Sequence, residues 1–142
     1  MISKEVAEAV SLARARIGIE ESVPVDAVRV ERLDKVGEHY HLVIFGPQGS
    51  RTAVATVDAS SMEVGEWAVL PGGTEHLAVD AETASSLARM AGATSDLVWQ
   101  SCRASRSPLY PLWRLRDAHD TRFVSQQGEV WRDLEDYGRG GG

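Results

Sequence analysis

The chain has 142 residues, of which 43% are hydrophobic and 25% are charged, a composition typical of a folded globular protein. Its net charge of −6 argues against a general binder of nucleic acids or anionic membranes, because both attract lysine and arginine. A chain of this length can bury a core without help from a disulfide or metal, and its single cysteine, Cys102, excludes an internal disulfide.

The start of the chain, "MISKEVAEAVSLARARIG", lacks the apolar core of a signal peptide, because Glu5 and Glu8 interrupt it. No stretch approaches the roughly 20 apolar residues that a membrane helix needs. We therefore expect a cytoplasmic protein with no membrane partner.

The first half predicts a helix followed by antiparallel strands. A helix over residues 3–17 has Ser3 placed to cap its start and Gly18 placed to end it. Strands are predicted over 27–33, 39–45 and 51–58, and "EVGEWAVL" is a candidate for a short fourth strand. The breaker-rich stretch "PGGTEH", residues 71–76, predicts a linker.

The second half repeats this order. A helix is predicted from Asp80 to about Ala91, with Gly92 as its stop. Strands follow over 96–102, 110–116 and 121–127, with "GEVWRDL" as a turn and short strand. Because proline cannot donate to a sheet ladder, the two prolines of "SPLYP" predict that strand 110–116 lies at an edge or begins as a bulge.

Helix, strand, strand, strand thus occurs twice, with a period of about 70 residues. The sequence predicts an α+β fold with two tandem units, each a helix plus a three-stranded antiparallel sheet, packed as one compact body. The predicted organisation is a first unit over 1–70, a linker over 71–76, a second unit over 77–135 and a flexible tail over 136–142. The alternative is that two unrelated pairs of hairpins look alike.

Both halves carry an aromatic-bearing strand, a turn, and a second strand that leads into Glu-Val. The residues that fit this pattern are Tyr40, Leu42, Val57, Asp58, Glu63 and Val64, then Tyr110, Leu112, Trp113, Val124, Gly128, Glu129 and Val130. The pattern resembles a PepSY-type repeat, although Met62 stands where that family has a turn glycine and Ser125 where it has aspartate. The resemblance implies a helix on a three-stranded sheet and a binding role, often suggested as peptidase inhibition, with no catalytic residues.

A positively charged segment rich in aromatic residues extends from Trp99 to Arg122 in this acidic protein. Arginine, tryptophan and tyrosine are enriched at binding hot spots. We expect an acidic surface or extended peptide of another protein to bind this segment. The predicted partner-binding residues are Trp99, Arg103, Arg106, Tyr110, Trp113, Arg114 and Arg116. The competing interpretation places the tryptophans in the core and pairs the arginines with local carboxylates.

The sequence gives weaker support for catalysis or metal binding. Cys102 could act as a nucleophile with His119 or His76 as base, and the arginines beside it could lower its pKa. His39 and His41 share one strand face, but no third metal ligand has recognisable spacing. We therefore predict no metal, no cofactor and no catalytic residue.

The resulting functional prediction is a non-catalytic module that inhibits, neutralises or scaffolds a partner protein, as a peptidase inhibitor, an immunity protein or an assembly subunit. The alternative is a small enzyme or small-molecule binder that uses Cys102 and its neighbouring arginines. The sequence leaves the oligomeric state open.

Overall fold

The computed structural model describes residues 3–134, so the predicted tail over 136–142 lies outside the described residues. Contacts divide the chain into two compact units. The first comprises the chain through Glu31 together with Gly37–His76, and the second comprises Arg32–Val36 and the chain from Leu77 onward.

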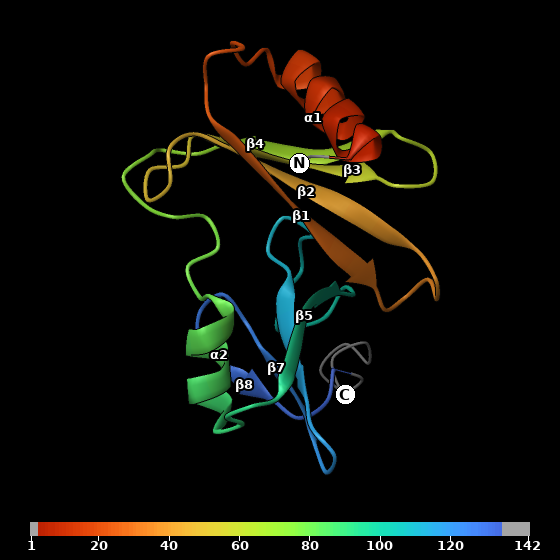
Figure 1. Ribbon diagram of the computed structural model, residues 1–142, viewed down its shortest axis with the longest axis vertical. Helices are drawn as coiled ribbons and strands as arrows, with labels where there is room; N and C mark the ends of the chain where they lie inside the picture. The colour runs from red at the N-terminus through yellow and green to blue at the C-terminus, as the bar shows by residue number, and fades with distance from the viewer. Residues whose placement is uncertain (1–2, 135–142) are drawn as a thin grey trace. The chain divides into compact units, whose positions relative to one another are not determined.

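The first unit is one helix followed by a four-stranded meander (Figure 1). Its elements are α1 (Lys4–Ile17), β1 (Val25–Arg32), β2 (His39–Phe45), β3 (Ala53–Asp58) and β4 (Val64–Val69). Each strand pairs antiparallel with the next. The predicted caps of α1 are confirmed: the Ser3 hydroxyl accepts from the Val6 N–H at 3.1 Å, and Gly18 is left-handed with φ 83°.

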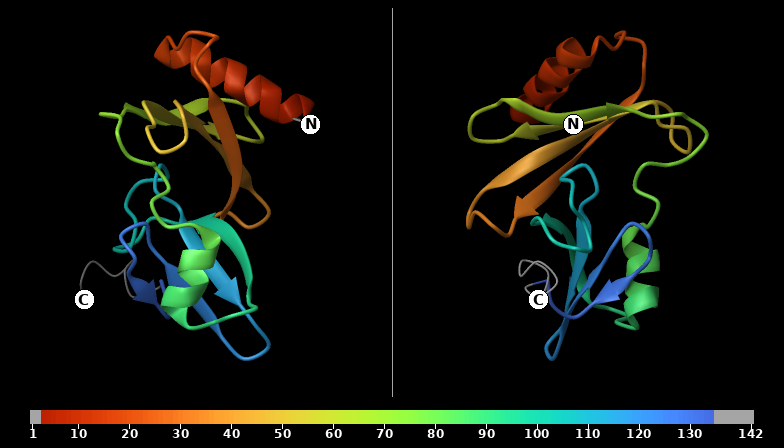
Figure 2. Two further views of the ribbon diagram at one scale, coloured as in Figure 1. Left: turned by 60° about the vertical axis from the view of Figure 1, so that its left-hand side comes forward. Right: turned by 180° about the vertical axis from the view of Figure 1, so that it is seen from behind.

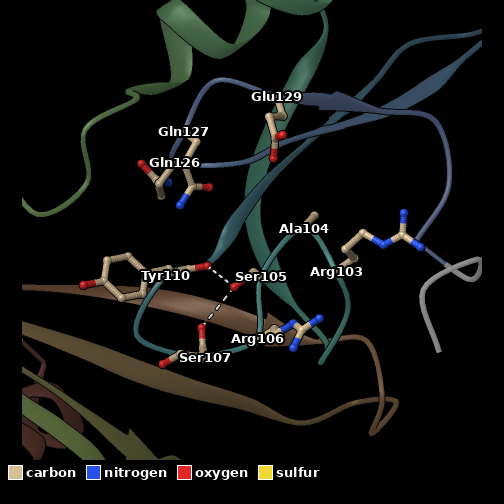
Figure 3. A pocket seen from close by; sticks show the side chains of 9 residues that line it. All are labelled: Arg103, Ala104, Ser105, Arg106, Ser107, Tyr110, Gln126, Gln127 and Glu129. Atoms are coloured by element: carbon tan, nitrogen blue, oxygen red, sulfur yellow. Dashed lines mark hydrogen bonds between the residues drawn. The ribbon is translucent and has the colours of Figure 1, made fainter. Parts of the chain in front are cut away.

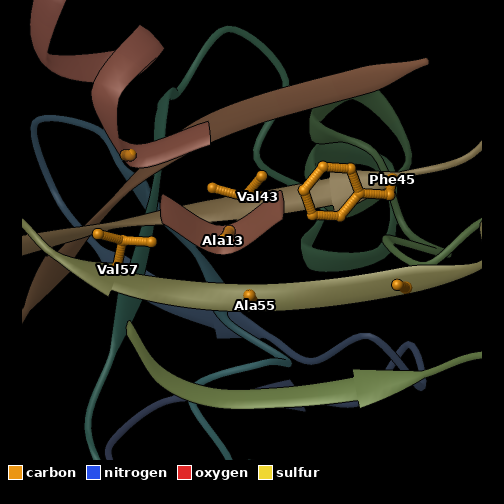
Figure 4. Close-up of a cluster of buried hydrophobic side chains, with 7 residues drawn as sticks. Ala13, Val43, Phe45, Ala55 and Val57 are labelled. Atoms are coloured by element: carbon orange, nitrogen blue, oxygen red, sulfur yellow. The ribbon is translucent and has the colours of Figure 1, made fainter. Parts of the chain in front are cut away.

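Small side chains let α1 lie close to the sheet. Ala9 and Ala13 of the helix are fully buried in one cluster with Val43 and Phe45 of β2. Figure 4 shows Ala13 beside these two side chains. Alanines of β3 and Val57 complete this cluster. Because side chains alternate along a strand, the face of β2 that carries Val43 and Phe45 also carries its histidines.

The segment predicted as a linker is bound to the first unit near its end. The Thr74 carbonyl accepts from the Arg51 N–H at 3.0 Å. The buried Arg51 guanidinium donates to Glu75 at 2.8 Å and to Asp26 at 2.7 Å. Glu75 also accepts from the Gly49 N–H at 3.0 Å. The backbone bond to Thr74 and the charge-assisted bonds to Glu75 make both residues part of the first unit.

The second unit has the same order of elements (Figure 2). It contains α2 (Ala81–Ala88), β5 (Thr94–Trp99), β6 (Leu112–Arg116), β7 (Thr121–Val124) and β8 (Val130–Trp131), with each strand antiparallel to the next. Asp80 caps α2 as predicted, but the helix ends before Gly92. Arg89 adopts the left-handed conformation with φ 56°, and the Met90 N–H bonds to the Ser85 carbonyl at 3.0 Å. Met90 is thereby turned into the core.

Strand β6 lies between β5 and β7, so its prediction as an edge strand is wrong. Pro111 precedes the first paired residue, Leu112, and therefore does not interrupt the ladder. Leu112 packs with Val98 on one face, and Leu115 packs with Val124 and the α2 side on the other. Both leucines are fully buried.

The predicted fold class, α+β with two helix-plus-three-strand units, is wrong. Each unit pairs four strands, in the order β4-β3-β2-β1 in the first and β5-β6-β7-β8 in the second, and residues 3–134 contain only the two helices. The protein is therefore mostly β. Each unit has a fourth strand, since residues 64–69 and 130–131 pair with the strand before them, and the short strands predicted within "EVGEWAVL" and "GEVWRDL" are thereby confirmed. Neither helix of the described chain is long and apolar enough to cross a membrane.

Candidate functional site

A pocket of about 400 Å³ lies in the second unit, between the loop that joins β5 to β6 and the loop that follows β7 (Figure 3). It includes three predicted partner-binding residues, Arg103, Arg106 and Tyr110. The rest of its lining is Ala104, Ser105, Ser107, Gln126, Gln127 and Glu129.

Ser105 organises the first loop. Its backbone N–H and carbonyl both bond to Cys102 at 3.1 Å, which closes a tight bridge. Its buried hydroxyl accepts from the Trp99 indole Nε1 at 3.1 Å. The same hydroxyl can donate to the carbonyls of Ser107, at 3.0 Å, and Tyr110, at 2.5 Å. A single side chain thus fixes the backbone on which Arg106 and Tyr110 are carried.

Gln126 fixes the second loop. Its buried side-chain amide accepts from the Val79 N–H at 3.0 Å and donates to the Pro111 carbonyl at 3.1 Å. The turn that follows is closed by a bond from the Ser125 N–H to the Glu129 carbonyl at 2.9 Å. Because Gln126 satisfies backbone groups on two other segments, it holds its side of the pocket in place.

The charged and aromatic groups lie on different sides of this pocket. Figure 3 places the Tyr110 ring with Gln126 on one side and the guanidinium groups of Arg103 and Arg106 on the other. Both arginines are exposed, and Arg106 forms no ion pair with any residue in 3–134. Tyr110 is 40% exposed. The arrangement offers a guanidinium for an anionic group and an aromatic ring for an apolar one.

The remaining predicted partner-binding residues lie elsewhere in the second unit. Trp99 is buried, with the Arg32 guanidinium 5.7 Å from its ring centre. Trp113 is half-buried and donates from Nε1 to the Val79 carbonyl at 2.7 Å. Arg114 pairs with Asp96 on the neighbouring strand through two hydrogen bonds.

Arg116 is more exposed than these residues. Its Nη2 lies 3.7 Å from the Asp96 carboxylate. Packing and hydrogen bonds within the second unit therefore explain the positions of Trp99 and Trp113, and the pair with Asp96 explains that of Arg114. Arg116 lies at the edge of the ion-pair network around Asp96.

The polar wall residues Ser105, Ser107, Gln126, Gln127 and Glu129 were not predicted as site residues. Uncharged polar residues in loops give no periodic signal, and two loops separated in the sequence meet only after folding. The sole available hint was the density of polar residues in "VSQQGEV".

Cys102 has the properties of a structural thiol. It is 5% exposed, its Sγ lies 3.8 Å from the Ser105 carbonyl oxygen, and burial raises its pKa. A reactive cysteine needs the reverse, a lowered pKa and access to solvent. Cys102 is also not among the residues that line the pocket.

No family model, curated protein or solved structure matches the chain. The resemblance to PepSY-type repeats therefore stays a prediction from short motifs. Met62, at the position of that family's turn glycine, has a φ of 56°. The fold that the resemblance implied, with three strands beside each helix, is not the one observed.

Proposed function

We propose that the protein is a non-catalytic binding module whose second unit captures an acidic, extended segment of a partner protein. One observation carries this proposal: Arg106, exposed and without an ion pair within residues 3–134, borders a pocket of about 400 Å³ together with Arg103 and Tyr110.

The chemistry of these groups favours a carboxylate-bearing ligand. A guanidinium offers a planar pair of donors that matches a carboxylate, and it keeps its charge at all physiological pH values. Tyrosine gives a large contact area at a small entropic cost. Glu129 on the pocket wall repels a second anionic group, so it directs the acidic part of the ligand toward the arginines.

The role that follows is to occlude or to scaffold the partner, as an inhibitor, an immunity-type neutraliser or an assembly subunit. The resemblance to PepSY-type repeats also implies a binding role. We propose the cytoplasm as the setting, and a free, buried thiol such as Cys102 is compatible with a reducing compartment.

The alternative, an enzyme or small-molecule binder that uses Cys102, has less support. Burial of the thiol and its raised pKa oppose nucleophilic chemistry. A small anionic ligand in the same pocket would use the arginines without Cys102, and it is the competing outcome of the experiment below.

The test is affinity co-purification from the native host, with bound proteins identified by mass spectrometry. The bait is the full chain, either unchanged or with Arg103→Glu/Arg106→Glu. Arg16→Glu/Arg132→Glu is the matched control, because it reverses two exposed arginines outside the pocket.

The thermal midpoints of all three baits are compared first. We then expect one partner at equal stoichiometry, which the pocket variant loses and the control variant keeps. A partner retained by a folded pocket variant would contradict the proposal. If no protein binds but a small anion protects the unchanged chain from unfolding, the pocket serves a small molecule instead.

A further inference from the structure

The first unit contains a cluster of possible metal ligands that lies outside the pocket. On α1, Glu5 precedes Ala9 by four residues and Ala13 by eight, so the three share one helix face. That face packs on β2, where Val43 and Phe45 meet the two alanines. One helical turn earlier, the same packing brings Glu5 to the histidines at the start of β2.

The distances within this cluster are short. The Oε2 of Glu5 lies 2.7 Å from the Nε2 of His41 and 3.7 Å from the Nε2 of His39. One ligand atom from each residue lies within 4.8 Å of the other two. The imidazole rings are 5.5 Å apart, nearly perpendicular to one another.

The direct hydrogen bond between Glu5 and His41 explains why those two side chains lie together, but it does not explain the position of His39. At 3.7 Å, His39 is beyond the range of a hydrogen bond to the same oxygen. The Nε2 atoms of both histidines nevertheless lie near the same Glu5 oxygen.

We propose that Glu5, His39 and His41 bind a zinc ion, with water in the remaining position. Imidazole nitrogen and carboxylate oxygen are both zinc ligands, at bond lengths of about 2.0–2.2 Å. A tetrahedral ion with such bonds separates its ligand atoms by about 3.3 Å. The observed 2.7 and 3.7 Å lie on either side of this value, so small side-chain adjustments suffice.

The cluster also has the anchoring that a metal site requires. His41 is 4% exposed and sits within the paired part of β2, so its ring direction is fixed by the sheet. Glu5 is exposed and gives the ion a route from solvent. The nearby Arg29 opposes a cation, and the single carboxylate offsets it. A bound ion would clamp the start of α1 onto β2.

The test is isothermal titration of the tag-free full chain with zinc chloride, alongside its thermal midpoint with and without zinc. Glu5→Gln and His39→Ala remove ligands from side chains that are not fully buried. Glu8→Gln and His119→Ala are the matched controls, because both residues are exposed and lie outside the cluster.

The expected result is one zinc per chain, with a raised thermal midpoint. Glu5→Gln and His39→Ala should each weaken binding by at least about tenfold, and the controls should leave it unchanged. If zinc does not bind saturably at one ion per chain, the proposal is overturned. Binding that survives both ligand substitutions would overturn it equally.

Discussion

The indole Nε1 of Trp99, the last residue of β5, donates a hydrogen bond to the Ser105 hydroxyl at 3.1 Å. Both residues are buried. This bond holds the loop that carries Arg103 and Arg106, so Trp99 contributes to the pocket by fixing its backbone. Trp99 was predicted as a contact residue, and the structure gives it this supporting position instead.

The loop should therefore lose stability when the Ser105 hydroxyl is removed. Ser105→Ala leaves the buried Trp99 N–H without its acceptor, which should lower the free energy of unfolding by about 1–3 kcal/mol. Urea denaturation measures this change. Ser101→Ala, an exposed serine of the same loop, is the control. Equal stabilities of the two variants would show that the bond contributes nothing.

Trp113 should behave as a core residue. Its ring packs against the cluster around Leu115 and Val124, and its Nε1 donates to the Val79 carbonyl at 2.7 Å. We expect Trp113→Ala to cost about 3–5 kcal/mol, and Trp113→Phe to cost about 1 kcal/mol through the lost hydrogen bond. Trp67→Ala, at a residue that is 42% exposed, should cost less. A Trp113→Ala loss below about 1 kcal/mol would make this ring available for a partner.

Acid should weaken the turn after β3 through Asp58. The Ser61 N–H, then the Ser60 hydroxyl and N–H, donate to its carboxylate and lower its pKa from 3.8 to about 2. Because the pKa in the folded state lies below the unfolded value, this stabilisation is present above pH 3.8 and is lost as the pH falls toward about 2.

Asp58→Asn should accordingly lower the free energy of unfolding at pH 7 by about 1 kcal/mol. The difference from the unchanged chain should shrink between about pH 4 and pH 2. Denaturation at a series of pH values measures it, with Glu63→Gln as an exposed control in the same turn. A difference that stays constant across this range would exclude the proposed hydrogen-bonded carboxylate.

Cys102 should resist alkylation in the folded protein, because the thiol is buried and its pKa is raised by that burial. Iodoacetamide at neutral pH should label it only after denaturation. The rate is followed by mass spectrometry, with a free thiol of ordinary pKa as the reference. Rapid labelling of the native chain would revive the enzyme hypothesis.

Local signals in the sequence predicted local structure well. Ser3, Gly18 and Asp80 were recognised as caps, because capping depends on a few neighbouring residues. Gly92 failed as a helix stop, since Arg89 took the left-handed conformation that lets Met90 enter the core. Tertiary packing therefore decided this end of the helix against a local preference.

The candidate sites depended on contacts between segments distant in the sequence, whereas the fourth strand of each unit pairs with the strand just before it. The short fourth strand that "EVGEWAVL" predicted is confirmed as β4, which pairs with β3. Three of the residues singled out in the positively charged segment, Arg103, Arg106 and Tyr110, line the pocket, but alternation along 110–116 could not reveal that Arg114 pairs with Asp96. Gln126 and Glu5 reach their neighbours only through the fold, so no spacing predicted either.

The central claim is that a partner binds at the pocket beside Arg106. The most direct measurement is photo-crosslinking in the native host, with a photoreactive phenylalanine analogue in place of the exposed Tyr110 and, as control, in place of the exposed Trp67 of β4. The account predicts one crosslinked partner from position 110 that Arg106→Glu abolishes and Arg132→Glu preserves. A crosslink that survives Arg106→Glu, or one obtained only from position 67, would contradict it.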